Sequence, residues 1–284
     1  MPERGAHGTR KGLSPFLLAI FYALVMAGTV YGFYVAREWR EPVAATVGQK
    51  VDAVVDYILI TTGVLFVLGH VVLGVFVLKF RGTNEAVYRS VSRKAEWAWA
   101  LVPVLVMAVI SEVGVLVMGM PVWKELYGET PADAIGVEVV AKQFAWIVRY
   151  PGKDGKLGAT KPELIDDIKN PVGLDKNDPA AKDDLIERGV LTLPDNKTAS
   201  VRLRSHDVIH SFAVPAFRLK QDIIPGFVGH TQFRPLRTGQ FEIACAELCG
   251  IQHYSMRGII QVKTPEEFAK WQSEQKGWLE LYSR

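Results

Sequence analysis

Three long apolar runs lie within the first 120 residues, and an alternating apolar–polar pattern follows them. The runs cover residues 15–36, 57–78 and 97–120, and His70 and Glu112 are their only histidine, acidic or basic residues. Each run is long enough to cross the roughly 30 Å hydrocarbon core of a bilayer, which takes about 20 residues. We therefore predict a membrane anchor in residues 1–122, with three transmembrane helices.

The first run has a second interpretation, as a signal peptide. A signal core usually has about 7–15 apolar residues, whereas this run is 22 residues long, so we expect a retained helix. Basic residues are concentrated in the N-terminal arm and before the third run: Arg4, Arg10, Lys11, Lys79, Arg81, Arg89, Arg93 and Lys94. The positive-inside rule places these segments inside. Residues after about 122 then lie outside, on the periplasmic side of a bacterial inner membrane.

Short β-branched segments separated by turns fill residues 123–263. The segment 190–205 is typical, because it reads as two strands around a Pro-Asp-Asn turn. Short strands with regular turn signals predict an all-β sandwich or barrel. After it, Thr264 as N-cap, Pro265 and Glu267 predict one C-terminal helix in residues 264–284. The predicted fold is thus N-terminal transmembrane helices followed by an all-β domain.

Residues 153–187 interrupt the rhythm of the strands. Between residues 163 and 187, eight acidic residues outnumber three lysines, which gives a net charge of −5. We interpret this insertion as a solvated loop, and the alternative is a docking surface for a basic protein, since complementary charge steers encounters. No basic stripe with interleaved aromatic residues is present, which excludes nucleic acid as a partner.

Both cysteines of the chain lie in CAELCGIQHYSM, residues 245–256, together with His253 and Met256. In an exported domain, two cysteines favour a disulfide. The spacing Cys-x3-Cys-x3-His also approaches that of a zinc site completed by an upstream histidine. Copper is the third interpretation, because thiolates, imidazoles and a weak thioether ligand form electron-transfer copper sites. Met256 favours copper over zinc, and two thiolates four residues apart could bridge two metal ions.

A further histidine ligand must come from another part of the chain. The stretch SHDVIHSFAVP, residues 205–215, contains His206 and His210. His210 precedes a strand and can lie beside the cysteine loop, whereas we expect His206 to be a solvated neighbour. His230 is expected to be an ordinary surface histidine.

These motifs resemble those of subunit II of the haem–copper oxidases, the copper A subunit of cytochrome c oxidase. The cysteine motif of that family, Cys-x-Glu-x-Cys-x3-His-x2-Met, matches Cys245, Glu247, Cys249, His253 and Met256. Three further motifs match in order along the chain: Glu96, Trp99 and Pro103; Ser205, Asp207, Val208, His210 and Ser211; and Leu219, Lys220, Asp222, Ile224, Pro225 and Gly226. The matches cover about residues 55–263.

The resemblance implies a cupredoxin-like barrel that holds a binuclear copper A centre. Cys245 and Cys249 would bridge two copper ions, with one of His210 and His253 on each ion. Met256 and the backbone carbonyl of Glu247 would be weak outer ligands. The centre would accept single electrons from cytochrome c and pass them to the haem of the catalytic subunit, for oxygen reduction coupled to proton translocation. No Cys-x-x-Cys-His motif is present, so the chain is expected to bind no haem.

The resemblance also implies partners and accessory sites. The partners would be the catalytic subunit I, subunit III, cytochrome c and the lipid membrane. The Glu247 carboxylate would bind magnesium at the border with subunit I, Glu96 would stand at the entrance of a proton-uptake path, and Asp207 would lie near the docking face for the donor. Electrons would enter at Phe144 and Trp146, where the family usually has Trp-Tyr-Trp.

Two other functions were weighed against this one. A quinol oxidase subunit of the same fold would lack the copper ligands, all of which this chain keeps. A copper A subunit of another terminal reductase, such as a nitric oxide reductase, stays open as the alternative, because the acceptor chemistry belongs to the partner chain.

Overall fold

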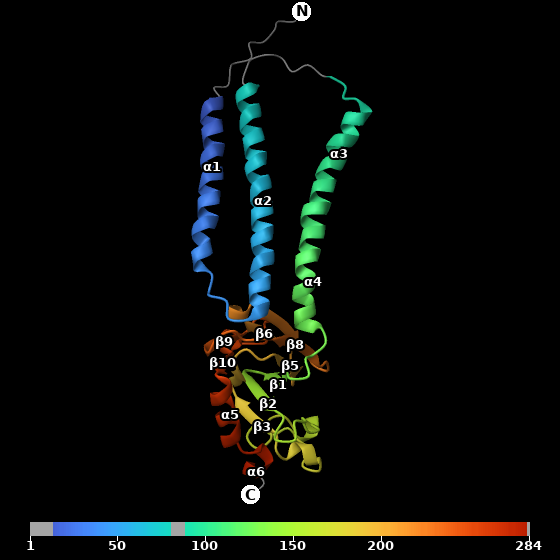
Figure 1. The fold of residues 1–284 in the computed structure, drawn as a ribbon, viewed down its shortest axis with the longest axis vertical. Helices are drawn as coiled ribbons and strands as arrows, with labels where there is room; N and C mark the ends of the chain where they lie inside the picture. Colours follow the sequence, from blue (N-terminus) through green and yellow to red (C-terminus); the bar gives the residue numbers. More distant parts are fainter. Residues whose placement is uncertain (1–13, 81–88, 283–284) are drawn as a thin grey trace, which may run out of the picture. The chain divides into compact units, whose positions relative to one another are not determined.

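The computed structural model describes residues 14–80 and 89–282 (Figure 1). Arg4, Arg10, Lys11 and Arg81, which entered the prediction of orientation, lie outside these ranges. The chain divides into two compact units, Met1–Arg40 with Val55–Val115, and Glu41–Val54 with Leu116–Arg284. The second unit therefore includes a short segment that precedes the second apolar run.

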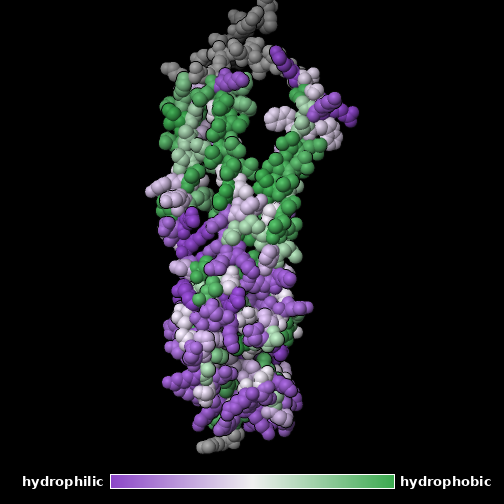
Figure 2. Space-filling model, in the orientation of Figure 1, coloured by the Kyte–Doolittle hydropathy of each residue, from purple (hydrophilic) through white to green (hydrophobic). Residues whose placement is uncertain are grey.

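All three apolar runs are helical. Three continuous helical stretches are long and apolar enough to cross a membrane: Pro15–Trp39, Thr46–Lys79 and Arg93–Tyr127. Their elements are α1 (Pro15–Ala36), η1 (Arg37–Trp39), α2 (Thr46–Lys79), α3 (Arg93–Met107), η2 (Ala108–Val113) and α4 (Gly114–Tyr127). Figure 2 shows hydrophobic side chains over the long helices and mostly hydrophilic ones over the β domain. A helix that is apolar on all sides is typical of a membrane span.

The β domain consists of two five-stranded sheets. The first has the order β3-β2-β1-β5-β8 and the second the order β4-β10-β9-β6-β7. The strands are β1 (Ile135–Lys142), β2 (Ala145–Tyr150), β3 (Leu185–Arg188), β4 (Val190–Pro194), β5 (Ala199–Ser205), β6 (His210–Val214), β7 (Leu219–Ile223), β8 (Gly229–Phe233), β9 (Gly239–Cys245) and β10 (Arg257–Lys263). The predicted fold class, apolar helices followed by an all-β domain, is confirmed.

The main core contains alternating side chains from both sheets. In β5 and β9, residues such as Val201, Leu203 and Ile243 are buried while their neighbours are more exposed, as the period of two requires. The segment before α2 also enters this core, because Ala44 and Ala45 are fully buried. The backbone of Ala44 donates to Ala216 O at 2.8 Å and accepts from Leu236 N at 2.9 Å.

One local prediction is confirmed and another needs correction. The segment 190–205 does form two strands, but β4 pairs with β10 and β5 pairs with β1 and β8, so the strands belong to different sheets. The C-terminal helix is broken into α5 (Pro265–Glu274) and α6 (Trp278–Tyr282). The capping box of Thr264 and Glu267 at its start is present as predicted.

The acidic insertion has a buried side. Val172, Leu174 and Ala181 pack with Val140 of β1 and Ile147 of β2 in a second hydrophobic cluster, which also includes Trp278 and Leu279 of α6. The first sheet is therefore covered on both faces at β1 and β2. The interpretation of a solvated loop is wrong for these residues, because the segment contributes to a core of its own.

Three charged residues, called here the Arg149 network, lie beneath the insertion: Glu138, Arg149 and Asp184. Arg149 is 2% exposed and donates to Asp184 Oδ2 at 2.6 and 3.0 Å and to Glu138 Oε2 at 3.1 Å. Arg149 also donates to the carbonyl of Gly158, and Gly158 N donates to Asp184 Oδ2 at 3.0 Å, so the network anchors the insertion to the sheet. Burial raises the pKa of Asp184 to about 6, although Arg149 opposes the shift.

Candidate metal centre

The cysteine loop connects two neighbouring strands. Cys245 is the last residue of β9, and Met256 directly precedes β10, which pairs antiparallel with β9. The loop therefore returns to its starting point, and Cys245 N donates to Met256 O at 3.2 Å. Within the loop, His253 begins the short helix η6 (His253–Ser255). Strand pairing thus brings the two ends of the motif together.

His210 reaches the same place from another strand. It is the first residue of β6, and β6 pairs with β9 so that Phe212 stands opposite Cys245. Ala246 N donates to Ser211 O at 3.1 Å, which closes the contact between the cysteine loop and β6. The expectation that His210 and the cysteine loop meet is therefore met by the fold.

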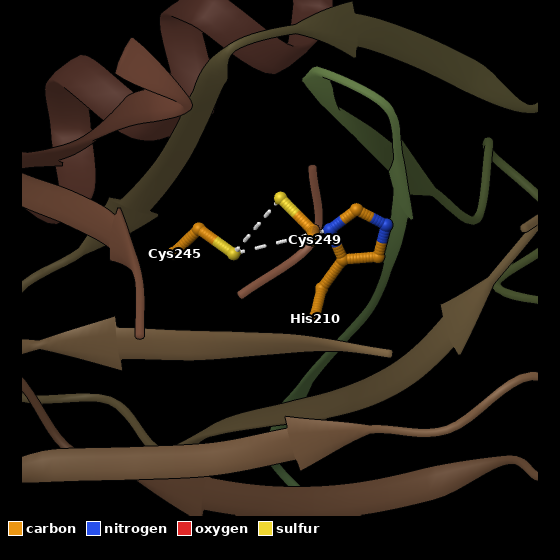
Figure 3. Close-up of side chains that lie close together, drawn as sticks. All are labelled: His210, Cys245 and Cys249. Atoms are coloured by element: carbon orange, nitrogen blue, oxygen red, sulfur yellow. Dashed lines mark hydrogen bonds between the residues drawn. The ribbon is translucent and has the colours of Figure 1, made fainter. Parts of the chain in front are cut away.

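The donor atoms of this cysteine–histidine centre (His210, Cys245, Cys249, His253 and Met256) converge. The two Sγ atoms are 3.7 Å apart, and His210 Nδ1 is 3.9 Å from Cys245 Sγ. Figure 3 shows both thiols and the His210 ring pointing toward one another. On the other side, Cys249 Sγ lies 3.8 Å from His253 Nδ1 and 3.8 Å from Met256 Sδ. The Glu247 carbonyl oxygen is 3.2 Å from Cys245 Sγ.

The orientation of His210 is determined by Asp207. His210 Nε2 lies 2.8 Å from Asp207 Oδ1, and a carboxylate can only accept, so Nε2 carries the proton and the lone pair of Nδ1 faces Cys245. Burial alone would raise the pKa of Asp207, but hydrogen bonds from Gln143 N, His210 and Val208 N lower it below its usual value. A carboxylate behind a ligating histidine is a common feature of metal sites.

Both cysteines are free thiols and are buried. Their 3.7 Å separation is far longer than a disulfide bond of about 2.05 Å. Burial, together with the neighbouring Cys245 thiol, raises the pKa of Cys249 to about 11. Since typical metal–thiolate bonds are about 2.3 Å, one ion can contact both sulfurs at this separation. The donors present fit a thiolate-bridged metal site.

The residues where electrons were expected to enter lie against this centre. The Phe144 ring is half-buried and packs on Gly250, where a Cβ would come within 3.0 Å of it. Gly250 has φ of +141°, which a side chain rarely tolerates, so two constraints require glycine here. Trp146 is only 1% exposed, and its ring centroid is 6.4 Å from that of His210. Phe144 alone of the two offers a surface to solvent.

Other predicted residues occupy different places. His206 is half-buried, not solvated, and burial lowers its pKa; it lines a cleft of about 350 Å³ with Arg204 and Phe227. His230 is partly buried and lies 3.0 Å from Ser200 Oγ. Glu96 is exposed in the first turn of α3, where a carboxylate favours the helix dipole.

Sequence reasoning missed two contacts that support the centre. Gln143 Nε2 donates to Cys249 O at 2.6 Å, and Asp207 holds the His210 ring. The three-residue spacing between Asp207 and His210 was a usable signal for the second contact. No local signal marked Gln143, which approaches the loop from the turn between β1 and β2.

Comparisons with known proteins agree with this geometry. The family described as cytochrome c oxidase subunit II, periplasmic domain, matches residues 174–263. The alternative cytochrome c oxidase subunit 2 of Bradyrhizobium diazoefficiens is 36% identical over 273 residues, which are 94% of this chain and 95% of the relative. Cytochrome c oxidase subunit 2 of Cereibacter sphaeroides is 27% identical over 253 residues, 84% of this chain and 80% of the relative.

Among solved structures, the periplasmic domain of subunit II of the cytochrome oxidase of Bradyrhizobium japonicum is similar. It is 33% identical, with 51% of this chain and 95% of that chain covered and a TM-score of 0.37. The assignment rests on the sequence relatives, which are oxidase subunits and do not favour the nitric oxide reductase alternative. Because one relative matches nearly the whole chain at this identity, the chain belongs to the cytochrome c oxidase subunit II family.

Proposed function

We propose that the cysteine–histidine centre holds a binuclear copper A site. In this proposal the chain accepts single electrons from cytochrome c and passes them to the catalytic subunit of a respiratory haem–copper oxidase. The observation that carries the proposal is the convergence of imidazole and thioether donors on two adjacent thiols, at 3.7–3.9 Å. Family membership supports the same role, since members are subunits of an oxidoreductase complex.

The arrangement of donors favours two ions over one. His210, Cys245 and Cys249 place their donor atoms within 4.8 Å of one another, whereas His253 approaches the pair from the side of Cys249. A single structural zinc takes four ligands, but this site offers two thiols, two imidazoles, a thioether and a carbonyl. The thioether of Met256 is a soft donor that suits copper. Two ions that share the thiolates would use the whole set.

The protein residues would act as a rigid frame. When bound, the copper pair supplies one-electron redox chemistry shared over both ions. Cys245 and Cys249 would bridge as thiolates, with His210 on one ion and His253 on the other, and with Met256 and Glu247 O as weak ligands. Burial of Cys245, Cys249 and Met256 excludes water, and β6 and β9 hold the ligands in place. Little movement is then needed when the charge changes.

Residues around the centre would guide the electron. The half-buried Phe144 ring packs on Gly250 of the cysteine loop, so a donor protein would contact it, while Trp146 lies behind it against His210. Asp207 is 31% exposed in its side chain and would contribute to the docking face while it orients His210. We also propose that the Glu247 carboxylate binds magnesium at the border with subunit I, and that Glu96 opens a proton-uptake path.

The proposal includes the location and the partners of the chain. The three apolar helices would anchor it in a bacterial inner membrane with the β domain on the periplasmic side. The partners would be the catalytic subunit I and subunit III.

Electron paramagnetic resonance of the full-length protein in detergent, loaded with copper, tests the proposal. We expect two copper ions per chain and hyperfine lines from two equivalent ions. A four-line signal from a single copper, or a silent site that retains zinc, would contradict it.

His210→Ala should disturb this spectrum, because it removes an imidazole whose Nδ1 faces Cys245. His206→Ala is the matched control, since His206 lies outside the group of converging donors. If the spectrum of His210→Ala matches that of the wild type, the assignment of His210 as a ligand is wrong.

A further inference from the structure

Glu112 is the one charged side chain in the third apolar run. It belongs to the π-helical turn η2 and is exposed on the surface of the chain. The nearest charged residues along the same helix, Glu96 and Lys124, are 16 and 12 positions away, or about 24 and 18 Å at the rise of an α-helix. Within a membrane, Glu112 would lie about 3 Å from the middle of the helical stretch Arg93–Tyr127.

The local backbone explains how the turn is held. The Tyr57 hydroxyl of α2 donates to the carbonyl of Ile110, a residue of the π-turn. A Cβ at Gly114 would overlap that hydroxyl, so glycine admits the tyrosine ring. Ile110 and Gly114 are four residues apart and face α2, whereas Glu112 is two residues from each and points to another side. π-turns inside helices often mark functional positions.

Glu112 has no partner within the part of the chain that the structure describes, residues 14–80 and 89–282. His70, the other ionisable residue of the apolar runs, is occupied elsewhere: its Nδ1 lies 2.9 Å from Phe66 O and its ring packs against Tyr22 of α1. His70 is also 13 residues from Tyr57 along α2, about 20 Å from the level of η2.

The side of the helix that carries Glu112 is otherwise apolar. The i→i+5 bonds of the π-turn place Met107 one turn before Glu112, and Leu116 follows Glu112 by four residues; Met107 is 53% exposed and Leu116 is 58% exposed. The three positions form one stripe along the helix, an arrangement that fits the packing of a second helix. A carboxylate in the middle of such a stripe is costly in lipid, and intramembrane charges almost always face protein.

We propose that Glu112 is a recognition site for a transmembrane helix of a partner subunit, which presents a basic side chain to it at mid-membrane depth. The stripe of Met107 and Leu116 would pack on that helix, and the carboxylate would specify its register by charge pairing. This inference rests on the proposed placement of the chain in a membrane oxidase. It adds an assembly site to the third helix, remote from the cysteine–histidine centre.

Co-purification of the assembled complex tests the inference. Full-length tagged chain with Glu112→Leu, Glu112→Gln or Glu112→Asp is compared with wild type, and Val109→Leu, which lies on another side of the π-turn and is 62% exposed, is the control. We expect Glu112→Leu to lower the recovery of catalytic subunit per tagged chain about tenfold, in the range of polar contacts between membrane helices. Glu112→Gln should be intermediate, and Glu112→Asp and Val109→Leu close to wild type.

Two outcomes overturn the inference. If Glu112→Leu recovers as much catalytic subunit as wild type, Glu112 is not a recognition site. If Glu112→Gln equals wild type while Glu112→Leu fails, the partner is a neutral hydrogen-bond donor and the basic side chain is wrong. A photo-crosslinking residue at position 112 should label a partner subunit, and one at position 109 should label lipid; the reverse result also contradicts the inference.

Failure of the inference can be told apart from failure of the proposed function. Each tagged variant is also examined by electron paramagnetic resonance. We expect the copper spectrum to be unchanged by Glu112→Leu, because the substitution is remote from the donors. Absence of the two-copper spectrum in wild type would refute the copper site, whereas an unchanged recovery with an intact spectrum would refute only the role of Glu112.

Discussion

The β domain buries two groups of polar side chains, and only one of these groups contains its own counter-charges. In the Arg149 network, one guanidinium contacts two carboxylates at 2.6–3.1 Å, and Arg204 adds a second cation 3.2 Å from Glu138. In the cysteine–histidine centre, thiols, imidazole nitrogens and a thioether face one another at 3.7–3.9 Å, and no lysine or arginine among the described residues pairs with the two thiols.

The difference separates a structural cluster from a binding site. Buried charges that find their counter-charges in the same chain hold two segments together, here the insertion and the first sheet. Buried donor atoms that converge without a cation can bind an external ion, as we propose for the cysteine–histidine centre. Each group gathers residue types that often occur at functional sites. The two groups are distinguished by whether their buried side chains have partners of opposite charge.

The largest expected effect is the loss of copper when both thiols are replaced. Cys245→Ser together with Cys249→Ser should reduce bound copper from two ions per chain to none, because the bridging donors are gone. The free energy of unfolding without copper should fall by about 2 kcal/mol or less, since the shape of each side chain is kept. Metal analysis and urea unfolding measure the two quantities. If the double variant retained copper, the two thiols would not be the copper donors, and the contrast with the Arg149 network would not hold.

The converse substitution should damage the fold. Arg149→Met leaves Asp184 and Glu138 buried without their shared cation, which costs about 3–5 kcal/mol. Arg202→Met is the control, because Arg202 is 50% exposed in its side chain and lies 3.9 Å from Glu138; its cost should stay below about 1 kcal/mol. Equal effects of the two substitutions would show that the network is not structural.

The same network predicts a dependence on pH. Burial raises the pKa of Asp184 from 3.8 to about 6, so the folded state keeps a proton that the unfolded state has lost. The contribution of this carboxyl to stability therefore falls as the pH rises from about 4 to about 6. Arg149→Met removes the opposing cation, so this substitution should lower the free energy of unfolding more at pH 8 than at pH 5. A uniform loss at both values would contradict this assignment.

Asp207→Asn should have a smaller effect, confined to the metal. The substitution removes the carboxylate that holds Nε2–H of His210. Removal of such a partner typically lowers metal affinity about 10–100-fold. Competition with a copper chelator measures the change, and Glu242→Gln, in a surface pair with Arg257, is the control. Unchanged affinity would show that the fold alone orients His210.

Met256→Leu is expected to have the smallest effect on binding. Leucine has a similar volume, and in the proposed site Met256 is only a weak ligand, so both copper ions should remain. The reduction potential should shift, because a weak thioether ligand is one of the factors that tune it. Spectroelectrochemistry measures the shift. Loss of one ion would make Met256 a primary ligand.

A feature could be predicted from the sequence when the residues that form it lie close together along the chain. Cys249, His253 and Met256 share one short loop, so their spacing alone indicated a metal site. The Arg149 network joins residues up to 46 positions apart, Glu138 and Asp184, and in sequence its two carboxylates look like surface charges. The partition of β4 and β5 between two sheets was also beyond a local pattern, because strand pairing is decided by distant segments.

The burial of Ala44 and Ala45 in the β domain has a consequence for maturation of the chain during export. The described contacts that this segment makes with the domain begin at Glu41, whose carbonyl accepts from Arg218 at 2.6 Å, and continue through Ala44 and Ala45. A protease that cut between Ala36 and Arg40 would release α1 and leave these contacts intact. Whether the first helix is kept or removed, the same folded domain would remain covalently attached through α2.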